Sequence, residues 1–125
     1  MTLRIRITAG TVVAKAVLND TSVAEKVWAA LPVELQMHSW GGELYGSTLL
    51  DFPEEKPQEV VSRGDLAYGP LGRGHALCIF FGPTPASVAD EPRAAAGVTV
   101  FGKVEGDFSQ FFSVKSGTRV RFERA

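Results

Sequence analysis

The sequence predicts a small, mainly β fold, a barrel or a sandwich of seven or eight short strands with one or two helices. Short segments in which apolar and polar residues alternate recur along most of the chain, and turns rich in glycine and proline separate them. Only one segment has a clear helical spacing of its apolar residues. With 125 residues, 45% of them hydrophobic, the chain has the size of a single domain, residues 1–125, and is expected to bury about two-thirds of its surface.

The first two strands follow from the pattern near the N-terminus. Leu3, Ile5 and Ile7 alternate with arginine and threonine, which predicts a strand with one apolar and one basic face. After a turn at Ala9-Gly10, the pattern predicts a second strand over Thr11–Leu18. Because both faces of this second segment are mostly apolar, we expect it to lie deep in the fold.

A single helix is predicted after these strands. Ser22 and Glu25 have the spacing of a capping box, in which each side chain binds a free backbone N–H of the first turn. Apolar residues then recur at helical spacing up to Leu31, and Pro32 prevents the helix from continuing. We therefore expect a short amphipathic helix that packs on a sheet or across the mouth of a barrel.

The rest of the chain predicts more strands, joined by turns and loops. Further strands are expected at Val33–Trp40, Glu43–Thr48, Ala76–Phe81, Val98–Glu105 and Thr118–Glu123. Connections are expected at Gly41-Gly42, Asp51–Pro57, Ser62–Asp65, Gly69–Gly74 and Pro83–Gly97, and one helical turn within Gly106–Phe112.

Composition excludes several classes of protein. With 13 Lys and Arg against 14 Asp and Glu, the net charge is −1, so no nucleic-acid partner is expected. One cysteine, Cys78, excludes an intrachain disulfide and is typical of a reducing compartment. The first residues carry charges where a signal peptide is apolar, and no apolar run is long enough for a membrane span. We therefore expect a cytoplasmic protein with no membrane partner.

No metal or cofactor site is expected. The histidines and the cysteine, His38, His75 and Cys78, do not have the spacing of a zinc site, and the last two should point to opposite faces of one strand. Cys78 lies in an apolar run, which favours a buried thiol over a nucleophile. The glycine-rich segment Gly69–Gly74 leads into a strand and not a helix, so it lacks the context of a phosphate-binding loop.

Arginines alternate with apolar residues in the first and last predicted strands. If these strands are neighbours, Arg4, Arg6, Arg119 and Arg121 form a basic stripe on one outer face. A solvated face that protects a sheet edge is the simpler interpretation of this pattern.

Aromatic residues beside glycines suggest a ligand pocket. Trp40, Tyr45 and Tyr68 lie at strand ends, where side chains can line a concavity, and phenylalanines such as Phe81 can add apolar walls. Polar groups among them, His38 and Glu43, would orient a ligand, as in many small-molecule sites. The alternative is that these aromatic residues form the core of the barrel.

An ordered set of motifs resembles the cyclophilins. Val100-Phe-Gly-Lys-Val104 is similar to a late strand of their barrel, and the two strands, helix, strand and hairpin before it follow the same order. Nearly the whole chain is similar to a family of small bacterial and archaeal cyclophilin-like proteins. The motifs that carry this likeness are Trp40-Gly-x-Glu-x-Tyr45, Gly64-Asp-x-x-Tyr68 and Ala76-Leu-Cys-x-Phe-Phe-Gly-x-Thr-Pro85. The resemblance implies a closed eight-stranded cyclophilin-like β-barrel with one or two short capping helices.

The resemblance also identifies residues at which this chain departs from the prolyl isomerases. Where cyclophilins read Phe-His-Arg, this chain has Met37-His38-Ser39, so the arginine that stabilises the twisted prolyl bond is replaced by Ser39. Val98 replaces a late-strand histidine, and Pro92–Gly97 has no equivalent of the pocket tryptophan. These departures predict a pocket without ordinary isomerase catalysis.

Three functions are therefore considered. In the first, the barrel binds a small molecule or an extended peptide in its cleft, with Trp40, Tyr45, Tyr68 and Phe81 as walls and Glu43 and His38 as orienting groups. A divergent isomerase, with Arg73 or Arg63 replacing the lost arginine, is the second. The third is a non-catalytic interaction subunit, and the oligomeric state is left open.

Overall fold

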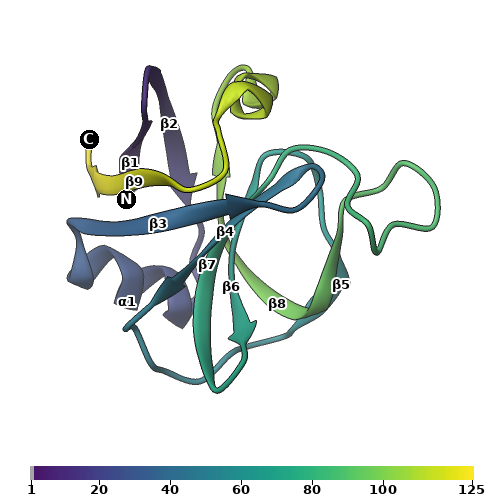
Figure 1. Cartoon of the computed structure of the whole chain (residues 1–125). Helices are drawn as coiled ribbons and strands as arrows, with labels where there is room; N and C mark the ends of the chain where they lie inside the picture. Colours follow the sequence, from purple (N-terminus) through teal and green to yellow (C-terminus); the bar gives the residue numbers. More distant parts are fainter. Residues whose placement is uncertain (1) are drawn as a thin grey trace.

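The computed structural model describes residues 2–125. In chain order, its elements are β1 (Arg4–Ala9), β2 (Val12–Leu18), α1 (Ser22–Ala30), β3 (Val33–Ser39), β4 (Glu43–Thr48), β5 (Gln58–Val60), β6 (Asp65–Leu71), β7 (Gly74–Phe80), β8 (Arg93–Val104), the 3-10 helix η1 (Phe108–Ser113) and β9 (Thr118–Arg124). Figure 1 shows these elements along the chain. None of the described helices is long and apolar enough to span a bilayer.

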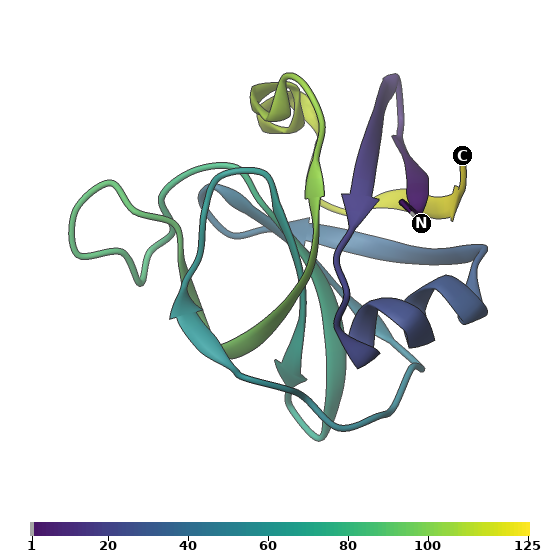
Figure 2. The ribbon, with the colours of Figure 1, turned by 180° about the vertical axis from the view of Figure 1, so that it is seen from behind.

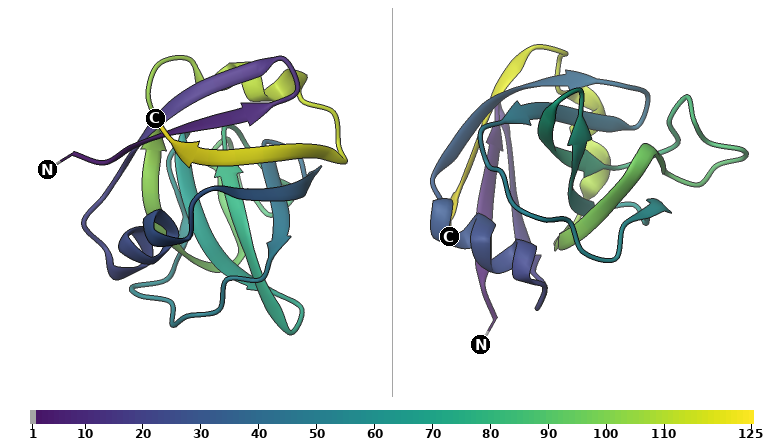
Figure 3. Two further views of the ribbon diagram at one scale, coloured as in Figure 1. Left: turned by 90° about the vertical axis from the view of Figure 1, so that its left-hand side faces the viewer. Right: turned by 90° about the horizontal axis from the view of Figure 1, so that it is seen from below.

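Eight of the strands form a closed ring. Their order is β2-β1-β9-β3-β4-β7-β6-β8, and pairing of β8 with β2 closes it (Figure 3). The strand pairs are antiparallel, and the ninth strand, β5, joins only the first half of β8. The predicted closed eight-stranded barrel is therefore confirmed.

Strand alternation fills the inside of the ring with large apolar side chains. Ile5, Leu44, Leu77, Phe101 and Phe122 come from five different strands, are fully buried and belong to one cluster. The two helices lie at different ends of the ring (Figure 2), and buried side chains of both join the same cluster. The inner core is thus complete without the residues that face outward.

The helix is where the sequence predicts it, but its cap differs. Thr21 is the N-cap residue, and its hydroxyl accepts a hydrogen bond from the backbone N–H of Ala24. The N–H of Val23 donates to the carboxylate of Glu55, at 2.8 Å, which lies far along the chain. The predicted capping box of Ser22 and Glu25 is therefore wrong by one residue, because a long-range carboxylate satisfies the first turn.

Two strand predictions need correction. The second strand was expected to be buried on both faces, yet Val13 on β2 is 54% exposed, because no layer covers its outer face. The segment Pro83–Gly97 was expected to be irregular throughout, whereas β8 already begins at Arg93. Pairing with the short β5 extends this strand, and β5 itself consists of exposed residues with no apolar alternation.

The first and last strands, β1 and β9, are neighbours, but they carry no basic stripe. Arg119 and Arg121 donate to the carboxylate of Glu34 at 3.1 and 2.8 Å. Arg4 forms an ion pair of 3.1 Å with Glu105. Acidic partners therefore neutralise most of this face, as expected for a solvated sheet surface.

Candidate functional site

A cavity of about 240 Å³ lies on the outer face of the barrel, and we call it the outer pocket. Its lining residues come from the β3–β4 hairpin, β6, β7 and the first half of β8: Trp40, Glu43, Tyr45, Pro70, Leu71, Ala76, Cys78, Ala94, Ala95, Ala96 and Val98. It lies outside the ring because side chains alternate along β4: Leu44 fills the core, while Glu43 and Tyr45 point outward.

Small residues leave the space that the pocket occupies. Ala76 and Cys78 lie on β7, and Cys78 is directly opposite Tyr45 of β4. Three successive alanines at the start of β8 line it as well. Because side chains of this size cannot fill the gap between β4 and β8, a cavity with largely apolar walls remains.

The β3–β4 hairpin holds Trp40 and Glu43 in place. The backbone N–H of Trp40 donates to the carbonyl of Glu43 at 2.8 Å, and the N–H of Gly42 donates to the carbonyl of Pro83 at 2.6 Å. A Cβ atom on Gly42 would lie 2.3 Å from the carbonyl carbon of Gly82, so only glycine allows this close approach. The hairpin is thus fixed against the end of β7.

Glu43 is the acidic group of the outer pocket. Only 6% of the residue is exposed, and burial raises the pKa of its carboxyl from 4.5 to about 7, although a hydrogen bond with the Cys78 thiol lowers that pKa slightly. No ion pair among residues 2–125 involves Glu43. Near neutral pH this group can therefore donate a hydrogen bond when protonated, or attract a positive charge when ionised.

Cys78 is buried, as the sequence predicts, and it is not activated. Burial is the main cause that raises the pKa of its thiol well above the ordinary value, and the neighbouring Glu43 raises it further. A neutral thiol is a poor nucleophile. Cys78 therefore contributes a small polarisable surface and a hydrogen bond to the pocket.

The loop that leads into β8 is held by internal hydrogen bonds. The Glu91 carboxylate accepts from the N–H groups of Val88 and Ala89 and pairs with Arg93 at 2.9 Å, and these hydrogen bonds lower its pKa to about 2. The Thr84 hydroxyl donates to the carbonyl of Arg93 at 2.5 Å. These contacts fix the start of the strand that carries the alanine wall.

Of the six residues predicted from the sequence to bind a ligand, the structure brings three together. Trp40, Glu43 and Tyr45 line the outer pocket. His38 is opposite Tyr45 on β3, with 5.9 Å between ring centroids, but it is exposed and does not line the cavity.

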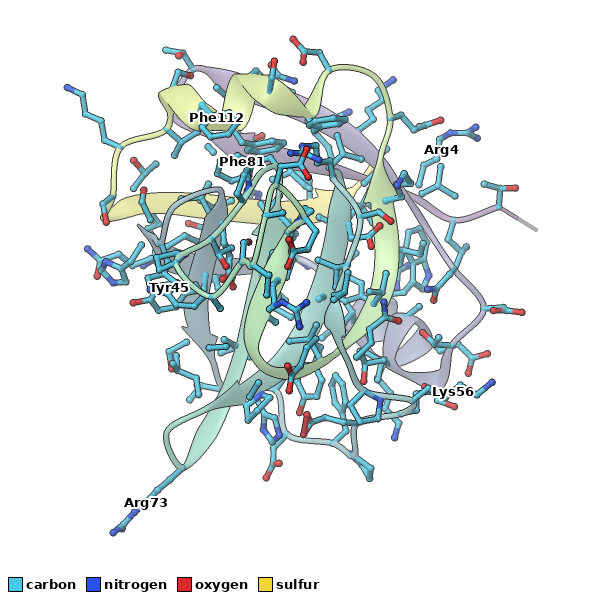
Figure 4. The ribbon with its side chains drawn as sticks, turned by 90° about the vertical axis from the view of Figure 1, so that its right-hand side faces the viewer. Arg4, Tyr45, Lys56, Arg73, Phe81 and Phe112 are labelled. Atoms are coloured by element: carbon cyan, nitrogen blue, oxygen red, sulfur yellow. The ribbon has the colours of Figure 1, made fainter. Side chains whose placement is uncertain are left out.

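Tyr68 and Phe81 are core residues instead. Tyr68 is fully buried, its hydroxyl donates to the Phe52 carbonyl at 2.8 Å, and its ring stacks on Phe52 and His75. Phe81 packs edge-on against Phe112, at 4.7 Å between centroids, and Figure 4 shows this pair well away from Tyr45. Tyr68 was predicted as a pocket wall because it lies beside a glycine, and Phe81 as an additional apolar wall, but the closure of the ring places both with the inner cluster.

The wall opposite the aromatic residues does not follow from the sequence pattern. Ala94, Ala95 and Ala96 lie in the segment predicted to be irregular, and Pro70 and Leu71 in a predicted connection. β6 in fact continues to Leu71, and only Gly72 and Arg73 form the hairpin turn. A run of three alanines before a strong strand pattern is the signal that would have indicated a wall without bulk.

No cationic side chain lines the outer pocket within residues 2–125. Arg73 lies at the tip of the β6–β7 hairpin and points away from the fold (Figure 4). Arg63 donates to the carbonyl of Asp90 at 2.7 Å. Neither arginine therefore lines the outer pocket.

The histidines and the cysteine do not form a metal-binding group within residues 2–125. The described residues contain no group of three or more His, Cys, Asp or Glu side chains that could hold a metal ion. His75 lies near Asp51 and Glu54, at 3.6 and 4.0 Å, on the side of the stacked Tyr68 ring.

Comparisons with known proteins agree with this architecture. The family model described as cyclophilin-like matches residues 3–123. The solution structure of the hypothetical protein AF2241 from Archaeoglobus fulgidus is similar, with a TM-score of 0.80 and 30% sequence identity over 99% of this chain and 95% of that chain. No match was found among curated proteins. Because the family model covers nearly all of the sequence, the chain belongs to the cyclophilin-like family.

Proposed function

We propose that this protein binds a small molecule, or one side chain of an extended peptide, in the outer pocket, and that it does so without ordinary prolyl isomerase catalysis. The observation that carries this proposal is a cavity with the two aromatic residues Trp40 and Tyr45 and a single buried carboxyl, that of Glu43. Apolar walls with a few polar groups that fix orientation are the usual composition of such sites.

The size of the cavity limits what can bind. Its volume of about 240 Å³ is below the range of roughly 300–1,000 Å³ that is typical of pockets for drug-sized ligands. A compact group that covers the Trp40 ring and reaches Glu43 therefore suits the site better than an extended cofactor.

The charge of the lining argues against isomerase activity. Rotation about a prolyl bond has a barrier of roughly 20 kcal/mol, and the isomerases that this chain resembles lower it with an arginine aimed at the twisted amide. The lining of the outer pocket supplies a carboxyl group and no guanidinium. We therefore expect no acceleration of cis–trans exchange in an Ala-Pro peptide, measured by exchange NMR at increasing protein concentration.

A fragment screen by NMR tests the binding function directly. The protein has two tryptophans, and only Trp40 lines the pocket, while Trp28 packs against Arg124. We expect binding fragments to shift the indole N–H resonance of Trp40 and to leave that of Trp28 unchanged. A broad library that shifts neither resonance contradicts the proposal.

A substitution that fills the pocket tests where the fragments bind, and the same substitution on α1 is its matched control. Ala96 lines the pocket at an exposed position, and Ala29 is an exposed alanine on α1. We expect Ala96→Phe to abolish the fragment shifts and Ala29→Phe to preserve them. Binding that survives Ala96→Phe places the ligand elsewhere on the molecule.

A further inference from the structure

The outer pocket contains a buried acid with no counter-charge, and this feature bears on the charge of the ligand. Glu43 is only 6% exposed, it lines the cavity, and it forms no ion pair within residues 2–125. An ionised carboxylate in such a place is unfavourable unless a positive group pairs with it. Glu43 therefore either keeps its proton or pairs with a cationic group of a ligand in the cavity.

The aromatic walls of the outer pocket also favour a positively charged ligand. Tyr45 follows Glu43 by two residues on β4, so both side chains lie on one face of the strand, and the hairpin holds Trp40 across from Glu43. The π faces of Trp and Tyr attract cations, and an acid combined with aromatic rings is a common arrangement for recognising substituted ammonium groups. The alanines opposite accept the apolar body of such a ligand.

We propose that the outer pocket binds a small organic cation, an amine or alkylammonium, with its charge at Glu43 and its apolar part against Trp40, Tyr45 and the alanine wall of β8. This inference rests on the proposed binding function and narrows its ligand class. Anionic ligands are disfavoured, because the lining offers them no cationic side chain and one acid.

The charged groups around Glu43 leave its role unchanged. On β7 the Cys78 thiol is neutral, since its pKa is raised. On β8 the guanidinium of Arg93 is paired with Glu91 at 2.9 Å and with Glu59 at 3.7 Å. On β3, the titratable side chain of His38 is opposite Tyr45.

The pH dependence of cation binding follows from Glu43. With a pKa of about 7, the carboxyl is ionised in about a tenth of molecules at pH 6 and in about nine tenths at pH 8. Affinity for a cation should therefore rise about tenfold over this range. His38→Gln is the control for the histidine, and the profile should persist in that variant.

A pair of isosteric probes tests the inference. Choline and 3,3-dimethylbutan-1-ol have the same shape, and only choline carries a charge. We expect choline to bind at least tenfold more tightly at pH 8, measured by the shift of the Trp40 indole resonance, with the Trp28 resonance as the internal reference. Equal affinity of the two probes overturns the inference.

Two variants test whether the carboxylate of Glu43 binds the positive charge of choline. Glu43→Gln should weaken choline binding at least tenfold at pH 8 and leave binding of the alcohol unchanged, while Glu25→Gln, at an exposed position on α1, should change neither. If Glu43→Gln does not fold, the pH series on the wild-type protein decides, and choline affinity that is flat from pH 6 to pH 8 overturns the inference.

The outcomes separate this inference from the proposed function. If the alcohol binds as tightly as choline, the pocket is a site for neutral apolar groups, so the inference fails and the function stands. If neither probe nor any fragment shifts the Trp40 resonance, both fail.

Discussion

The buried carboxyl of Glu43 should make this protein less stable as the pH rises, opposite to the effect of a carboxylate that is ion-paired in the folded state. Burial raises its pKa in the folded state from 4.5 to about 7, so the folded protein keeps a proton that the unfolded chain loses. Below pH 4.5 both states are protonated and the group contributes nothing. The free energy of unfolding then falls as the pH rises, and the loss is complete above pH 7.

The magnitude follows from the gap between the two pKa values. At about 1.36 kcal/mol for each pKa unit, a rise from 4.5 to about 7 corresponds to roughly 3 kcal/mol. Glu43→Gln removes the ionisable group and keeps the shape of the side chain. The free energy of unfolding of the variant minus that of the wild-type protein should therefore increase by roughly 2–3 kcal/mol from pH 5 to pH 8.5.

Urea unfolding followed by circular dichroism measures this difference at each pH. All other titrating groups are common to both proteins, so they cancel when the two unfolding free energies are subtracted. Any fixed effect of burying an amide also cancels, because it does not depend on pH. A difference between Glu43→Gln and wild type that stays constant from pH 5 to pH 8.5 would refute the reasoning.

Four further substitutions test contacts that hold the fold and the site in place. Tyr68→Phe leaves the N–H and carbonyl of Phe52 without their partner, so the free energy of unfolding in urea should fall by about 1–2 kcal/mol. Fragment binding should stay intact, and its loss would place Tyr68 in the site. Gly42→Ala forces a Cβ atom against the backbone of Gly82, so the free energy of unfolding should fall by roughly 2 kcal/mol or more and the Trp40 indole resonance should shift. An unchanged stability would contradict the close approach of Gly42 to Gly82. Thr21→Ala should lower the free energy of unfolding by about 1 kcal/mol, and Ser22→Ala should lower it by less than about 0.5 kcal/mol. The reverse order would support the capping box of Ser22 and Glu25.

The strands were predictable because apolar alternation is a local property. Leu3, Ile5 and Ile7 show it directly, and the apolar run at Ala76–Phe81 indicates a buried strand without knowledge of its neighbours. β5 carried no such signal, since its three residues are exposed and it exists only through pairing with β8. The cap of α1 was missed for a related reason: the carboxylate at its first turn belongs to a loop 32 residues away.

The site was only half predictable. Trp40, Glu43 and Tyr45 belong to one hairpin, so their common position follows from the turn and from strand parity. Which face of a strand points into a closed ring depends on the whole topology, and for that reason Tyr68 and Phe81 were placed in the pocket although they lie in the core. The alanine wall was missed because alanine has little strand propensity of its own.

A crystal structure of the protein with its strongest fragment bound tests the central claim most directly. We expect density for the fragment in the outer pocket, packed on Trp40 and Tyr45 opposite Ala96, with its polar or charged atom at the carboxyl of Glu43. Density elsewhere, for example in the wide groove of about 430 Å³ beside Pro32 and Leu50, with the outer pocket empty, would contradict it.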